Sequence, residues 1–94
     1  SEEDAFVIMD SLHNMFMAHM TAKFKAKESG FDESQHFKKA FTYARLAMEV
    51  DGIIHEKKWC NDPECHYKQN VEDFRKMFKT ELAELAMKNN GNTE

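Results

Sequence analysis

The sequence predicts an all-α protein, a small three-helix bundle with long helices that is expected to be oligomeric. The 94 residues include eight Phe and seven Met but only three Gly and one Pro, so apolar side chains are plentiful and turn-forming residues are scarce. This balance is typical of helical proteins. Start and stop signals divide the chain into three long segments. A chain of this size buries a modest core and often depends on a partner, a metal or a second copy.

The first helix is predicted over residues 2–29. Ser1 can cap it, and the acidic run Glu2–Asp4 suits the positive end of a helix dipole. Gly30 supplies the left-handed residue that commonly ends a helix. About 28 residues are therefore expected in one continuous helix.

The second helix is predicted over residues 33–50. Asp32 is placed to cap it, with Gln35 three positions later in the reciprocal capping arrangement. Asp51 and Gly52 form a turn-favouring pair that is expected to end this helix.

The third helix is predicted over residues 63–88, because Asp62 is a favourable cap and Pro63 occupies the first helical position, where its missing N–H does no harm. Residues 1–88 are thus expected to form a single helical domain. The polar residues 89–94 are expected to be a disordered tail.

Charge and composition exclude several classes of function. Thirteen Lys and Arg against seventeen Asp and Glu give a net charge of −4, which makes nucleic-acid binding unlikely. No apolar run has the roughly 20 residues of a membrane span, and the first residues do not resemble a signal peptide. With only two cysteines, a reducing cytoplasm is the expected location. Phosphate-binding loops and nucleophile motifs are absent from the sequence, so no catalytic residues are predicted and an enzyme is not expected.

Helices one and two carry more apolar surface than one buried face requires. Apolar residues of the first helix span an arc of about 200°, whereas one buried face needs little more than 100°. A tight bundle that exposes some Met and Phe would explain this. The alternative is a second surface for another protein, for which adaptable Met side chains are well suited. The candidate interaction residues are Phe6, Met9, His13, Met17, Met20, Phe24, Tyr43, Leu46 and Trp59.

A non-catalytic protein–protein interaction module, acting as an inhibitor, adaptor or regulatory subunit, is therefore the expected function. The partner is expected to be another protein, a second copy of the chain in a homodimer or larger oligomer, or both. Small acidic helical proteins of this composition include phage-encoded inhibitors of host machinery, an analogy at the level of the fold. His19 lies between Ile8 and Leu12 on the helical wheel, so an interface buried there is expected to weaken as this histidine protonates.

A compact set of possible metal ligands lies between the second and third helices. His55, Cys60, Cys65 and His66 supply four nitrogen or sulfur ligands within twelve residues, the number that a tetrahedral zinc site uses. Against zinc, four residues separate the cysteines, where structural sites usually have two. A Cys60–Cys65 disulfide or two free thiols are the alternatives. No cofactor is expected apart from this possible zinc ion, and a zinc-stabilised module associated with nucleic acid is the third functional hypothesis.

A small-ligand or nucleotide-binding helical oligomer is the second functional hypothesis. Its pocket would form between helices, with Lys23, Lys38, Lys39 and Tyr43 as the polar groups that contact the ligand.

Overall fold

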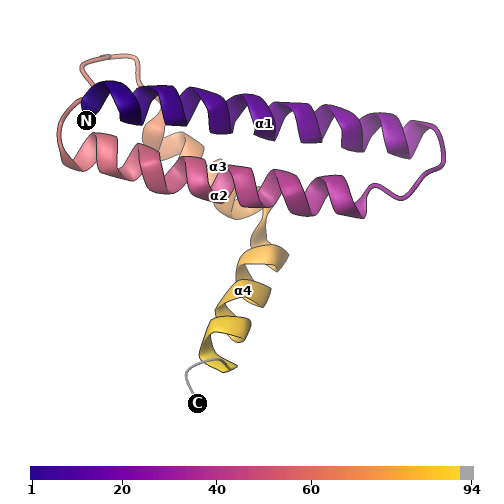
Figure 1. The fold of residues 1–94 in the computed structure, drawn as a ribbon. Helices are drawn as coiled ribbons and strands as arrows, with labels where there is room; N and C mark the ends of the chain where they lie inside the picture. The colour runs from indigo at the N-terminus through magenta and orange to yellow at the C-terminus, as the bar shows by residue number, and fades with distance from the viewer. Residues whose placement is uncertain (92–94) are drawn as a thin grey trace.

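In the computed structural model, which describes residues 1–91, the chain forms four helices and no strand. They are α1 (Glu2–Glu28), α2 (Ser34–Glu56), α3 (Tyr67–Met77) and α4 (Lys79–Gly91). The helices α1 and α2 run antiparallel and side by side, α3 packs mainly on α2, and α4 projects away from this hairpin (Figure 1). The all-helical class is confirmed, but the arrangement differs from three long helices. Across the described residues, no helix combines the length and apolar character that crossing a membrane requires.

Local signals account for both ends of α1. The Ser1 side chain accepts a hydrogen bond from the Asp4 N–H at 3.2 Å, which satisfies one of the free amides of the first turn. At the other end, Gly30 takes a positive φ of 76°, and the Phe31 N–H donates to the Ala26 carbonyl at 2.8 Å. This is the Schellman ending that a glycine after a helix favours.

The predicted end of the second helix at residue 50 is wrong, because α2 continues through Asp51 and Gly52 to Glu56. Asp51 is buried, and its carboxylate lies 3.2 Å from the ring of His55 one turn later. Tertiary packing therefore outweighs the helix-breaking tendency of glycine, which costs about 1 kcal/mol.

The predicted start of the third helix at Pro63 is also wrong, because α3 begins at Tyr67. Asp62 does cap a turn, since its carboxylate accepts from the Glu64 N–H at 2.9 Å and its carbonyl accepts from the Cys65 N–H at 3.2 Å. This turn does not propagate into a helix. The Cys65 side chain instead reaches the end of α2, where it contacts His55.

The single long helix expected over residues 63–88 is interrupted at Phe78, which separates α3 from α4. Its ring is 1% exposed, and its backbone leaves the helical region with φ −115° and ψ 31°. Burial of this ring redirects the chain, so α4 leaves the hairpin. Residues 89–91, expected in a disordered tail, belong to α4, and residues 92–94 lie outside the described part.

The core is small and centred on an aromatic cluster. Among the described residues, the buried apolar side chains are three alanines of α2 together with Ile54 and Phe78. The ring of Phe78 has its centroid 5.0–6.3 Å from the rings of four other phenylalanines, which come from α1, α2 and α3. These are Phe16, Phe37, Phe41 and Phe74. One residue thus joins all three helices.

Candidate functional site

The helix α1 packs on α2 through one side only. None of its 27 residues is buried, although all of them lie in the described part of the chain. One flank of α1 carries exposed Phe6, Met17 and Phe24, with exposed fractions of 39%, 50% and 54%. These positions fall within about 20° of one another on a helix of 3.6 residues per turn. We call this line of side chains, together with exposed His13 between them, the α1 flank.

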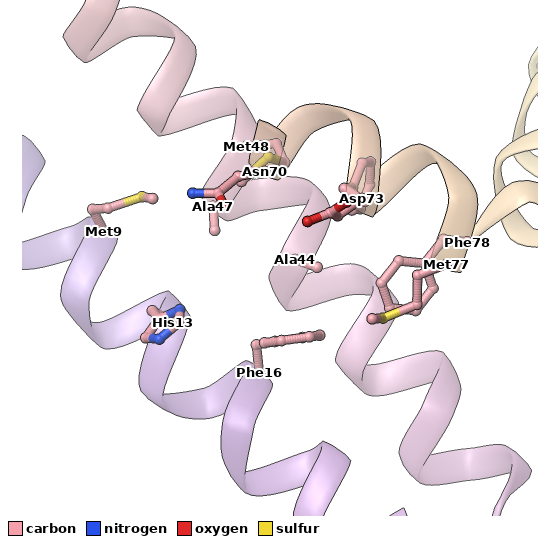
Figure 2. Close-up of a pocket in the computed structure, with 11 residues that line it drawn as sticks. Met9, His13, Phe16, Ala44, Ala47, Met48, Asn70, Asp73, Met77 and Phe78 are labelled. Carbon is pink, nitrogen blue, oxygen red and sulfur yellow. The ribbon is translucent and has the colours of Figure 1, made fainter. Parts of the chain in front are cut away.

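An apolar groove of about 220 Å³ lies beside the α1 flank, between α1 and α3 (Figure 2). Its floor is formed by the small side chains of Ala44 and Ala47 on α2. His13 belongs to both the α1 flank and this groove, so the two surfaces are continuous. The groove is lined by Met9, His13, Phe16, Ala44, Ala47, Met48, Asn70, Asp73, Phe74, Met77 and Phe78.

Other predicted interaction residues are partly used within the chain. Met9 and Met20 are half-buried on α1, and Leu46 is half-buried on α2. Trp59 is also half-buried, with the Lys57 ammonium 5.6 Å from its ring centroid. Tyr43 stacks on His19 with the ring centroids 5.5 Å apart. The exposed members of the predicted set are therefore those of the α1 flank.

His19 packs within the hairpin. Its Nδ1 lies 3.4 Å from Nδ1 of His36, which places two imidazoles against each other between α1 and α2. Two imidazoles thus lie between the two long helices of one chain. The sequence instead predicts His19 at an interface with another molecule.

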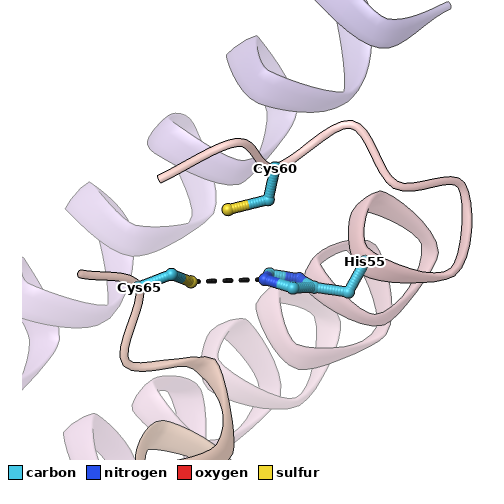
Figure 3. Close-up of side chains that lie close together, drawn as sticks. All are labelled: His55, Cys60 and Cys65. Atoms are coloured by element: carbon cyan, nitrogen blue, oxygen red, sulfur yellow. Dashed lines mark hydrogen bonds between the residues drawn. The ribbon is translucent and has the colours of Figure 1, made fainter. Parts of the chain in front are cut away.

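Three of the four predicted metal ligands come together at the end of α2. The Nε2 or Nδ1 atom of His55 and the Sγ atoms of Cys60 and Cys65 offer ligand atoms that all lie within 4.8 Å of one another. His55 is in the last turn of α2, and both cysteines are in the loop before α3 (Figure 3). The Cys65 Sγ lies 3.2 Å from His55 Nε2. Both cysteines are free thiols.

The His55 ring is held in one orientation by its neighbours. Its Nδ1 is 2.8 Å from the Asp51 carbonyl oxygen and 3.2 Å from the Asp51 carboxylate, and both of these are acceptors. The proton is therefore on Nδ1, and the lone pair of Nε2 faces Cys65. The ring of Tyr67 stacks on the imidazole with the centroids 4.1 Å apart.

Two titratable neighbours of this imidazole have shifted pKa values. Burial raises the pKa of Asp51, while His55 acts in the opposite direction through its charge and hydrogen bond. The Tyr67 N–H lowers the pKa of Cys65, but Cys60, desolvation and the charge of Asp51 together outweigh it and leave this pKa raised. A cation bound beside Cys65 would act in the opposite direction and lower this pKa.

The fourth predicted ligand, His66, is outside the cluster. It is exposed and lines the same surface depression as His55 and Cys65, but its ring nitrogens do not join the three ligand atoms. His66 directly follows Cys65, and adjacent side chains diverge, so both cannot easily converge on one point.

The lysines of the predicted ligand site are only partly brought together. Lys38, Lys39 and Tyr43 line a surface depression of about 340 Å³ with His19 and Thr42. Lys23 lies elsewhere, with its ammonium 4.7 Å from the centroid of the Phe37 ring. The ammonium thus makes a cation–π contact with one ring of the aromatic cluster.

The residues that support the cluster are not among those predicted from the sequence. The sequence predicts a helix end at Asp51, although Asp51 and His55 have the four-residue spacing that places two side chains on one helix face. That spacing could have identified the pair. No comparable local signal marks Tyr67, whose stacking on His55 depends on the path of the intervening loop.

Comparison with protein-family models, with curated proteins and with solved structures finds no match for this chain.

Proposed function

We propose that this protein is a non-catalytic protein–protein interaction module that binds through the α1 flank and the adjoining groove, with a second copy of the chain as its partner. Such a module serves as an inhibitor, adaptor or regulatory subunit. The observation that supports the proposal most strongly is the amount of surface left uncovered by the single chain.

The accessible surface of the chain is 7170 Å². A compact monomer of 11.0 kDa has about 5,600 Å² by the usual scaling of surface with mass. The difference, about 1,600 Å², exceeds the roughly 800 Å² that each partner contributes to an interface of standard size. The exposed α1 flank and the projecting α4 both contribute to this excess area.

The side chains of the α1 flank suit an interface core. Phe6, Met17 and Phe24 are each at least 39% exposed, so solvent contacts much of each apolar side chain. Full burial of a side chain of this kind contributes about 1.5–3 kcal/mol. Aromatic residues and methionine are also enriched in the cores of protein interfaces. Coverage of this flank would therefore stabilise a complex.

The α1 flank is self-complementary in an antiparallel arrangement. Phe6 and Phe24 each lie nine positions from residue 15, and His13 and Met17 each lie two positions from it. A two-fold axis at residue 15 therefore places Phe6 opposite Phe24 and His13 opposite Met17 of a second copy.

Charge also favours the antiparallel arrangement of two copies. The first turn of α1 carries Glu2, Glu3 and Asp4, whereas its last turn carries Lys25 and Lys27. An antiparallel pair brings the acidic end of each helix near the basic end of the other, and the two helix dipoles then oppose each other favourably.

Sedimentation equilibrium of variants tests which surface is used. Met17→Ser combined with Phe24→Ser is expected to raise the dimer dissociation constant at least about 100-fold, because each interface loses the contacts of both copies. Val7→Ser is the matched control, since Val7 is 59% exposed but lies on the outer side of α1, away from the flank. It should change the constant less than about threefold. Equal weakening by both changes would contradict the assignment.

A further inference from the structure

We infer that His55, Cys60 and Cys65 form a zinc site, in which solvent supplies the fourth ligand. The inference is independent of the proposed interaction surface, because none of the three residues belongs to the α1 flank or to the groove. It depends on the ligand types, their separation and the groups that hold the imidazole.

The separation of the ligand atoms fits tetrahedral zinc. Bond lengths of about 2.3 Å to sulfur and about 2.1 Å to nitrogen place neighbouring ligand atoms about 3.5–3.8 Å apart. The 3.2 Å between His55 Nε2 and Cys65 Sγ is slightly shorter, and all three atoms lie within 4.8 Å. Figure 3 shows the three side chains converging on one space.

Asp51 and His55 have the arrangement typical of a metal-binding histidine. Such a histidine directs one nitrogen at the metal and donates its other N–H to a carboxylate or a carbonyl. Here the Asp51 carbonyl and carboxylate both accept at Nδ1, which leaves Nε2 available to the ion. Two thiolates balance the charge of the zinc ion, and the imidazole remains neutral.

The site joins the end of α2 to the loop that follows it. His55 belongs to α2, whereas Cys60 and Cys65 lie within the ten-residue loop 57–66. A zinc ion would fix this loop against the end of α2 and set the starting point of α3. Cys65 is exposed, so the open side of the site faces solvent, and a water molecule can complete the coordination.

Cobalt titration tests for the site directly. The full chain is reduced, stripped of metal and titrated anaerobically with Co²⁺, which gives visible bands in tetrahedral sites and an ultraviolet charge-transfer band when thiolate binds. Both signals should saturate at about one equivalent, and Zn²⁺ should remove both by displacing cobalt. A charge-transfer band that is absent, or a protein that forms a Cys60–Cys65 disulfide with Zn²⁺ present, would overturn the inference.

Variants separate the ligands from their neighbours. Cys65→Ser changes an exposed side chain, so it should fold normally and lose at least about 100-fold in metal affinity. His66→Ala should retain wild-type affinity within about threefold, because this ring is outside the cluster. Asp51→Asn should weaken binding about 10–100-fold with the thiolate band preserved. Equal loss in Cys65→Ser and His66→Ala would overturn the three-residue site, and helical circular dichroism checks that each variant is folded.

Discussion

Nδ1 of His19 in α1 lies 3.4 Å from Nδ1 of His36 in α2, so two imidazoles meet across the interface of the long hairpin. The contact is a hydrogen bond only when one Nδ1 carries a proton and the other does not. When both rings are protonated, the two nitrogens are both donors and the rings carry like charges. Tyr43 stacks on His19, and Lys38 and Lys39 line the same depression, so the charged side chains that line it are cationic.

Protonation of both rings should therefore loosen the α1–α2 hairpin. We expect acid to lower the melting temperature of the wild type more than that of His36→Gln. Thermal melts followed by circular dichroism measure the difference. His66→Gln is the matched control, because His66 is exposed and outside this contact, and it should keep the wild-type dependence.

Phe78 should be the side chain whose truncation destabilises the chain most. Its ring is 1% exposed and contacts phenylalanines of three helices, so Phe78→Ala should cost about 3–5 kcal/mol in the free energy of unfolding. Phe31→Ala removes a ring that is 73% exposed and should cost less than about 0.5 kcal/mol. Urea unfolding of both variants checks the prediction. A similar loss of stability in the two variants would show that the core is not centred on Phe78.

Replacement by alanine should change the free energy of unfolding in opposite directions at two glycines, Gly30 after α1 and Gly52 within α2. Gly52 lies inside α2, where a Cβ would meet only the Tyr67 hydroxyl at 3.4 Å, so Gly52→Ala should stabilise the chain by about 0.5–1 kcal/mol. Gly30 has φ +76°, so Gly30→Ala should destabilise it by about 1 kcal/mol although the space is open. If urea unfolding shows that both substitutions change the free energy of unfolding in the same direction, the helical assignment at Gly52 is contradicted.

Asp32 should make part of the stability sensitive to acid. The Ser34 N–H and hydroxyl both donate to its carboxylate, at 2.9 and 3.0 Å, and they lower the pKa of Asp32 in the folded chain. A lowered pKa contributes stability that is present above the unfolded pKa and is lost as the pH falls through the folded one. Below about pH 4, the melting temperature of Asp32→Asn should therefore fall less steeply than that of the wild type. Identical slopes would show that these hydrogen bonds do not stabilise the carboxylate.

The sequence predicts structure best where local signals act without competition. The Ser1 cap and the Gly30 ending define α1, and tertiary contacts do not oppose either of them. The predicted boundaries at Asp51 and Pro63 are wrong because burial of Asp51 and the contact between Cys65 and His55 outweigh local preference. Phe78 belongs to a continuous apolar stripe in the sequence, so the break there depends on packing against α1 and α2.

The candidate metal cluster could be predicted from residue types but not from spacing alone. The loop brings Cys60 and Cys65 to His55, whereas chain direction keeps His66 away. A local spacing of four residues identifies Asp51 as the partner of His55 only once α2 is known to continue past Gly52. The α1 flank was indicated by the breadth of the apolar arc, and the structure adds which of those side chains α2 leaves exposed.

The molar mass of the unaltered protein in solution, measured by light scattering at increasing concentration, tests the central claim most directly. Association through the α1 flank predicts a mass that rises toward twice 11.0 kDa and that falls back to 11.0 kDa for the Met17→Ser and Phe24→Ser double variant. A wild-type mass of 11.0 kDa at every concentration up to about 100 µM, well above a micromolar dissociation constant, would contradict it.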